Sequence, residues 1–397
     1  MNIPARPKLI AAISLIGTLL LVSHTAKADD ATDPVIGSEE TQDISPPTAA
    51  SHAPPLDESQ TFSLYGHWDT DLVSNLHGGI RTGSAVDSVA VGGFTLKGDR
   101  LGLPRSVFNF SLMATRAGNA NARLIGADTN PSNIEGNRNR LVLNTAFWQQ
   151  NWLNSSHIGL NTRLGVFDLN AEFDSTDSAA QLLNSSFGLT PSLTDNFSTS
   201  TFPQNGTGLV ANIGNTPNPE TATLAFKMGV IQGDVDQQTH PFSQGVLNIA
   251  EGQWRPNDNT TIKLGGWQKR GNGRPDLRGG YLSAEGSLLS TEHEAISGFI
   301  RASYAAGMLP QATGTNRYLS AGINWQAPVE TRPDDYLTLG IGNLRLNQGG
   351  QNERLFEAAY IARLTPHLYL QPDLQYIQNP GGNQPDAWVA ILRLHVE

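Results

Sequence analysis

The stretch Leu368–Gly382, LYLQPDLQYIQNPGG, decides the fold, because polar and apolar side chains alternate along it. The polar set is Gln371, Asp373 and Gln375, and the apolar set is Leu370, Leu374 and Tyr376. A period of two predicts a β-strand with one polar face and one apolar face. Pro372 has no backbone N–H to donate, so it predicts a bulge or a local break, and NPGG predicts the turn that follows.

The same alternation recurs from Thr61 to the end of the chain. Examples are SVFNFSLMATRAG at 106–118, TTIKLGGWQKRG at 260–271, EAISGFIRASYAAG at 294–307 and DAWVAILRLHV at 386–396. Turn clusters such as RPDD and NQGGQNE separate these segments, and the chain has 40 glycines. This pattern predicts an all-β protein built on an antiparallel sheet.

Two closed arrangements fit the alternation. A soluble sandwich packs its apolar faces inward, whereas an outer-membrane barrel turns them toward lipid and its polar faces toward a lumen. In TTIKLGGW, for example, Ile262 and Leu264 oppose Lys263 and Gly265. Periodicity alone leaves both arrangements open. The hydrophobic content of only 38% favours the barrel, since a wide lumen needs no apolar core.

Tryptophans near the ends of the expected strands predict aromatic girdles at the membrane interfaces. They are Trp68, Trp148, Trp152, Trp254, Trp267, Trp325 and Trp388. The stretch 181–214 is too long for a hairpin turn and predicts a loop that folds into the lumen and carries the constriction.

The N-terminal sixty residues predict export. Residues 1–28 combine a short basic start, an apolar run and small residues at Ala26 and Ala28, which is typical of a cleaved signal peptide. Residues 29–60 are acidic and rich in Pro, Ser and Thr, which predicts a disordered tail or linker. Residues 61–397 then form the barrel domain.

Composition excludes several function classes. The chain has no cysteine, so it has no disulfides, zinc–thiolate sites or cysteine nucleophiles. The net charge of −10 disfavours nucleic acid as a partner and favours neutral or cationic solutes. His293 lies between two glutamates in a turn-like stretch, which does not predict a metal site. No nucleophile–base constellation is present, so we expect neither an enzyme nor a cofactor.

Two long motifs resemble the carbohydrate-selective outer-membrane porins, the OprB family. The first is the opening stretch with Glu357, Tyr360 and Pro366 before it, and the second is RLGVFDLNAEFDSTDSAAQLLNSSFG at Arg163–Gly188. Weaker matches include Glu251, GGYLSAEGSLL with Glu285, and GFIRASY with Arg301. The chain ends on Glu397 where the family commonly ends on Phe, which bears on recognition by the insertion machinery.

The resemblance implies a transmembrane barrel of about sixteen strands in the outer membrane of a Gram-negative bacterium. It implies passive diffusion of monosaccharides, glucose above all, with small neutral sugars and outer-membrane lipid as partners. The alternative is a general-diffusion or structural barrel without sugar selectivity. The oligomeric state, monomer or trimer, stays open.

Side-chain phase then nominates residues that face the lumen, because a charge in an apolar strand is costly toward lipid. A sugar needs groups that donate and accept several hydrogen bonds. The candidates are Arg163, Glu251, Glu285, Arg301, Glu357, Gln371, Asp373 and Gln375. Each of them fits two roles, a ligand of the solute at the constriction or a structural contact on the inner wall.

Overall fold

A computed structural model describes residues 60–235, 240–271, 274–291, 293–309 and 312–397. The predicted signal peptide, 1–28, lies outside the described residues, as does all of the predicted linker except Gln60. Among the residues that the structure describes, no helix is long and apolar enough to cross a membrane.

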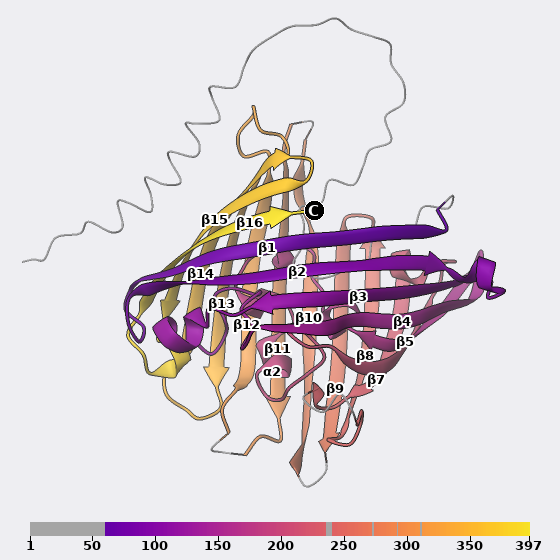
Figure 1. Ribbon diagram of the computed structural model, residues 1–397, viewed down its shortest axis with the longest axis horizontal. Coiled ribbons are helices and arrows are strands. Elements are labelled where there is room, and N and C mark those ends of the chain that lie inside the picture. The colour runs from indigo at the N-terminus through magenta and orange to yellow at the C-terminus, as the bar shows by residue number, and fades with distance from the viewer. Residues whose placement is uncertain (1–59, 236–239, 272–273, 292, 310–311) are drawn as a thin grey trace, which may run out of the picture. The chain divides into compact units, whose positions relative to one another are not determined.

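Sixteen antiparallel strands form one closed barrel in which each strand pairs with its neighbours in sequence, and β1 pairs with β16 (Figure 1). The strands are β1 (Phe62–His77), β2 (Gly83–Lys97), β3 (Ser106–Arg116), β4 (Arg140–Ser155), β5 (Ile158–Phe167), β6 (Gly206–Gly214), β7 (Leu224–Gln232), β8 (Val246–Asn257), β9 (Thr260–Gly271), β10 (Arg274–Ser290), β11 (Ala295–Ala306), β12 (Thr315–Gln326), β13 (Tyr336–Leu346), β14 (Glu353–Thr365), β15 (Leu368–Gln378) and β16 (Ala387–Val396). The predicted all-β barrel of about sixteen strands is therefore confirmed.

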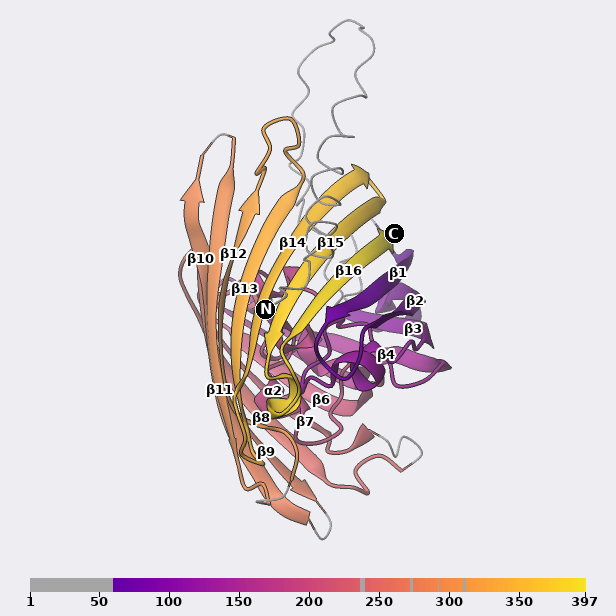
Figure 2. The same cartoon turned by 90° about the vertical axis from the view of Figure 1, so that its left-hand side faces the viewer.

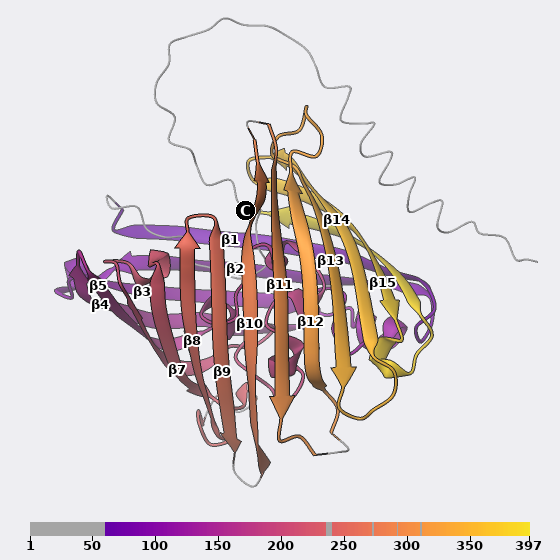
Figure 3. The ribbon, with the colours of Figure 1, turned by 180° about the vertical axis from the view of Figure 1, so that it is seen from behind.

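Short helices lie in the connections between the strands. They are η1 (Gly98–Leu101), η2 (Asn121–Ile125), η3 (Leu169–Ala171), η4 (Ala179–Gln181), η5 (Ser185–Phe187), α2 (Pro191–Thr194), η6 (Pro219–Thr221) and η8 (Pro380–Gly382). Figure 3 shows β7–β15 from behind, with α2 visible between the strands of the wall.

Alternation along each strand separates an outer face from an inner face. In β9, Leu264 is exposed on the outside, whereas Lys263 and Trp267 are buried on the inside. Trp267 packs against Phe197 inside the barrel, with ring centroids 5.7 Å apart. The prediction that Trp267 belongs to an outer girdle is therefore wrong, because its phase along β9 points it inward.

Ion pairs inside the barrel join β1 to β16, the strands that close it (Figure 2). Arg393 lies opposite Asp71, and its guanidinium donates to both carboxylate oxygens at 2.7 Å. Two residues along the same ladder, His395 Nδ1 lies 2.6 Å from Asp69 Oδ1. Both pairs connect the first and last strands of the chain, so they contribute directly to closure.

The position of β6 differs from the sequence prediction. This strand occupies residues 206–214, which the sequence predicts as the end of the loop 181–214. The inner positions of β6 include Gly206, Gly208 and Gly214, so the polarity contrast between its faces is low. A Cβ at Gly208 would come within 3.0 Å of the Phe167 ring, which explains why glycine is found there.

The ladder between β14 and β15 stops at Gln371 and Pro372 and resumes with the same register, Ala359 opposite Asp373 and Ala362 opposite Leu370. Toward β16 the pairing of Pro372 with Leu392 is uninterrupted. The structure therefore shows the local break that the proline predicts, and no bulge there.

Candidate functional site

Two connections fold into the barrel and build the site. The first inward loop, residues 117–139, follows β3, and the second inward loop, residues 168–205, follows β5. Both follow odd-numbered strands and therefore enter from the same end of the barrel, the end opposite the first residue of β1 and the last residue of β16. They bond to each other, since the Asn133 N–H donates to Leu183 O at 2.7 Å and the Ser185 N–H to Asn130 O at 2.9 Å.

Carboxylates on the inner wall hold the backbone of these loops. Four glutamates accept hydrogen bonds from loop N–H groups that no regular secondary structure would satisfy. The bonds run from Asp174 N to Glu251 at 2.8 Å, Ser178 N to Glu285 at 2.9 Å, Asn184 N to Glu357 at 3.2 Å and Asp128 N to Glu353 at 2.7 Å. The predicted residues Glu251, Glu285 and Glu357 thus act on loop backbone in the structure.

Arg301 is the cation at the centre of the second inward loop, and it is only 1% exposed. Its guanidinium donates to Phe187 O at 2.6 Å and to Asp174 O at 3.0 Å. The Asp174 carboxylate lies 3.1 Å away as its counter-ion. Arg301 therefore joins two turns of the loop to β11.

The other four predicted residues also contact the loops or neighbouring strands. Arg163 donates to Gln149 and to Glu172, and its guanidinium lies 4.4 Å from the centroid of the Phe147 ring. The remaining bonds run from Gln371 Nε2 to Gln181 O at 2.9 Å, and from Gln375 Nε2 to Pro131 O at 2.8 Å and to Asp373 Oδ1 at 3.0 Å. All eight side chains therefore lie inside the barrel, spread along the wall that holds the loops.

A polar cavity of about 220 Å³ lies between the two inward loops. The first loop supplies Asp128, Asn130 and Asn133, and the second supplies Asp168, Asn170, Ala180, Leu182, Ser185, Gly188, Thr194, Asp195, Thr201 and Phe202. Carboxylates, amides, hydroxyls and one aromatic ring thus line one space. Asn170 Oδ1 and Asp195 Oδ2 have no hydrogen-bond partner among the described residues.

None of the eight predicted residues lines this cavity. Seven of the lining residues lie in the stretch 181–214, which the sequence predicts as the loop that carries the constriction, but the sequence singled out none of them individually. A signal was present, because Asp and Asn cluster in GADTNPSNIEGN at 126–137 and in FDLN at 167–170. Such residues favour turns, however, so composition alone does not separate a binding loop from an ordinary one.

A narrow extension of about 30 Å³ continues the cavity toward the wall of β1–β4. It shares Asn133, Asp168 and Phe202 with the main cavity and adds His67 and Asn144. Phe202 packs against the apolar cluster that includes Val89 and Met113, so its ring is held at the junction of the two spaces.

Burial controls the charge of two loop carboxyls. Burial raises the pKa of Asp195 well above its usual range, and the adjacent Asp128 raises it further. Burial, with a smaller contribution from Asp87, raises the pKa of Glu135 to about 8. Glu135 accepts the Asn121 N–H at 3.0 Å, so it stabilises the first inward loop from within. With a pKa of about 8, Glu135 is therefore mostly protonated at neutral pH.

The described part of the chain contains no cluster of three or more His, Cys, Asp or Glu side chains arranged to hold a metal ion. The chemistry available at the cavity is hydrogen bonding and stacking of a ring on Phe202.

Comparisons with known proteins agree with this architecture. A family profile described as carbohydrate-selective porin, OprB family, matches residues 99–397. The high-pH structure of Pseudomonas putida OprB is similar, with a TM-score of 0.73 and 16% identity over 85% of this chain and 94% of that one. The low-pH structure of the same protein has a TM-score of 0.56 and 14% identity over 85% and 92%.

A Rh. blastica porin mutant has a TM-score of 0.53 and 11% identity over 84% of this chain and 99% of that chain. Identities this low bear on the fold alone. A search of curated proteins found no match.

Proposed function

The chain belongs to the carbohydrate-selective porin, OprB family, whose barrels lie in the outer membrane of Gram-negative bacteria, and we propose that it passes monosaccharides, glucose among them, by passive diffusion. The polar cavity between the two inward loops carries this proposal. It has both the acceptors and the aromatic surface that a sugar ring needs, and its size suits one sugar ring rather than an oligosaccharide.

Binding in such a channel must be weak enough for release, and a few hydrogen bonds together with one ring contact provide such binding. Asp195 lines the cavity and places a carboxyl group beside a solute there, where it can accept a hydrogen bond from a sugar hydroxyl. Asn170 lines the same cavity, and its side-chain amide carries both donors and an acceptor. In this proposal both residues contact the sugar directly.

The eight residues predicted from the sequence take a positioning role. By holding the inward loops against the wall, they set the width of the path, and the cavity residues contact the solute. Long connections of outer-membrane barrels face the outside, so the end from which the inward loops enter is the extracellular end. Residues 1–28 serve as the export signal, 29–60 as a spacer, and the outer faces of the strands contact lipid.

Single-channel conductance in planar bilayers tests the proposal. We expect millimolar glucose to reduce the ion current of the wild type, and Asn170→Leu to weaken that block. The matched control is Asn154→Leu, which changes an exposed asparagine on β4. Glucose should reduce the current of this variant as much as it reduces that of the wild type. If glucose leaves the wild-type current unchanged, the chain is a general-diffusion or structural barrel.

Liposome swelling addresses the size of the solute. Monosaccharides should enter proteoliposomes faster than disaccharides, by more than their difference in free diffusion. If the rates of entry differ only as much as the rates of free diffusion do, the cavity does not limit the path. Cross-linking in native membranes would then decide whether the barrel is a monomer or a trimer.

A further inference from the structure

The outer face of β10–β14 carries a charge pattern that the channel function does not use. Arg317 on β12 and Arg345 on β13 lie directly opposite each other in the ladder, and both are exposed on the outside of the barrel. Neither makes a hydrogen bond or an ion pair with a described residue. Like charges in directly opposed positions destabilise a sheet, so an external anion bound between the two arginines would relieve their repulsion.

A third arginine lies diagonally next to this pair. Arg354 on β14 is exposed opposite Asn343, two residues before Arg345, and donates to Gln378 at 3.3 Å. The three guanidinium groups gather on the surface of a chain whose net charge is −10. The positive charge is therefore local rather than a property of the whole barrel.

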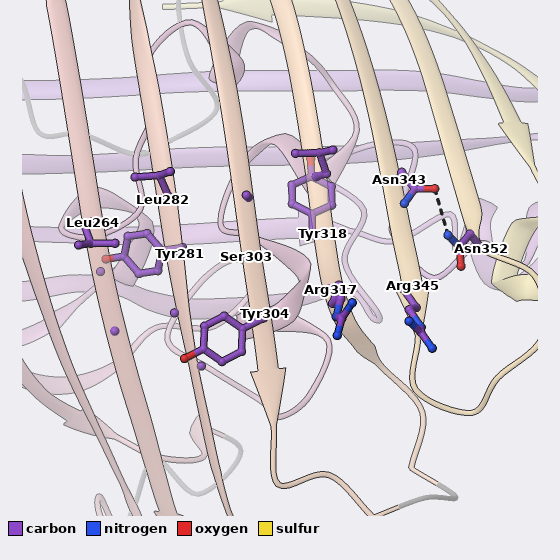
Figure 4. Close-up of a pocket in the computed structure, with 16 residues that line it drawn as sticks. Leu264, Tyr281, Leu282, Ser303, Tyr304, Arg317, Tyr318, Asn343, Arg345 and Asn352 are labelled. Carbon is purple, nitrogen blue, oxygen red and sulfur yellow. Dashed lines mark hydrogen bonds between the residues drawn. The ribbon is translucent and has the colours of Figure 1, made fainter.

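A groove of about 700 Å³ begins at these arginines and continues over the apolar outer surface. Leu264, Leu282, Ala302, Tyr304 and Leu319 line it together with Arg317 and Arg345, which Figure 4 shows next to each other on adjacent strands. Gly266 and Gly280 supply no side chain and leave the depression open. One end of the groove is thus cationic and the rest is apolar.

The adjoining surface extends the apolar part along the strands. A second groove of about 780 Å³ is lined by Ile300, Ala321, Ile341 and Phe356 among others. Ile300 and Ala321 pair with each other two residues beyond the pair Ala302 and Leu319, on the side away from the arginines. Together the two grooves offer a long apolar track beneath a cationic end.

We propose that this surface binds a phosphorylated, acylated lipid of the outer leaflet, with its phosphate between Arg317 and Arg345 and its acyl chains in the two grooves. The guanidinium fork matches phosphate geometry, and the apolar track distinguishes a lipid from a free anion. The arginines lie where β12 begins and β13 ends, at the extracellular end of the barrel. The inference rests on the orientation proposed above and not on sugar transport.

Thermal unfolding of the detergent-solubilised barrel, followed as heat-modifiable gel migration, tests the proposal with lipid A as the probe. Lipid A should raise the midpoint temperature of the wild type in a concentration-dependent manner, as ligand binding to the folded state requires. For Arg317→Gln with Arg345→Gln we expect about thirtyfold weaker binding, since each arginine near an anionic lipid surface contributes about 1 kcal/mol. The control Arg116→Gln removes an exposed arginine at the same end of β3 and should behave as the wild type.

Two further arms separate the alternatives. Ala302→Phe fills the groove without changing any charge and should also weaken lipid A binding. Inorganic phosphate that raises the midpoint as much as lipid A does would overturn the proposal in favour of a free-anion site. If Ala302→Phe instead converts an oligomer to monomers while lipid A has no effect, the groove is a subunit interface and the proposal is wrong. Glucose block of the current is independent of all these outcomes.

Discussion

Replacing Arg301 by methionine should release part of the second inward loop. The arginine side chain is fully buried, and its removal leaves the Asp174 carboxylate, also fully buried, without its counter-ion. Breaking a buried pair by removing one partner costs about 3 to 5 kcal/mol. Because about 1.4 kcal/mol is a factor of ten, the equilibrium between the docked and the released loop segment should shift by more than about a hundredfold.

The loop keeps its other anchors at Glu251, Glu285 and Glu357, so we expect local loosening and not ejection from the lumen. Single-channel recording of Arg301→Met should show a larger mean conductance, more open-channel noise and weaker glucose block. Adding Asp174→Asn should recover much of the wild-type behaviour, because the neutral amide keeps an acceptor for the Thr190 N–H, now 2.7 Å from Asp174 Oδ2, and leaves no buried charge.

The matched control is Arg278→Met, which removes an exposed arginine on the outside of β10 and should change none of the three readouts. All variants must first show heat-modifiable migration, so that a folding failure is not read as loop release. Wild-type conductance, noise and block in a folded Arg301→Met barrel would refute the anchoring role of Arg301.

Two further predictions concern the pH response and the closure of the barrel. Glu135 has a folded-state pKa of about 8 against an ordinary value of 4.5, so its stabilisation is present below pH 4.5 and is lost as the pH rises through 8. Glu135→Gln should reduce the fall of the thermal midpoint between pH 4.5 and 8. If the slope in this range is unchanged in the variant, other groups cause the pH dependence. Arg393→Met leaves buried Asp71 unpaired at the seam of β1 and β16 and should lower the midpoint clearly, whereas Arg393→Met with Asp71→Asn should lower it less.

How far the sequence predicts this molecule depends on the contrast between the two faces of each strand. In β9, where Leu264 alternates with Lys263, the strand and its phase follow directly from the residues. In β6 the inner positions are mostly glycine, because Phe167 and Ile231 pack close to the wall there, and the strand could not be predicted. Close contacts with side chains of the neighbouring strands thus remove the polarity contrast by which β6 would be recognised.

The candidate site could be predicted only indirectly. A charge in an apolar strand does indicate the inner face, and Glu251, Arg301 and Glu357 do lie there. The group that such a charge binds depends on the path of the loop backbone. That path cannot be predicted from the periodic pattern of polar and apolar residues. The Asp and Asn residues of the cavity are turn formers in the sequence, and they form a common surface only after the two loops bond to each other.

The glutamates on the inner wall indicate how a lone charged residue in a barrel strand should be interpreted. Where an inward loop packs against the wall its backbone is shielded from water, so the N–H groups there must find acceptors on the wall or remain unsatisfied. A carboxylate accepts two or more such bonds and is the strongest acceptor available. Glu285 and Glu357 each accept N–H groups from two successive loop residues, as an N-cap carboxylate does at the start of a helix. A lone glutamate among small and apolar strand residues therefore predicts a docking point of loop backbone before it predicts a ligand of the solute, and solute contacts should be sought in the loops that such residues hold.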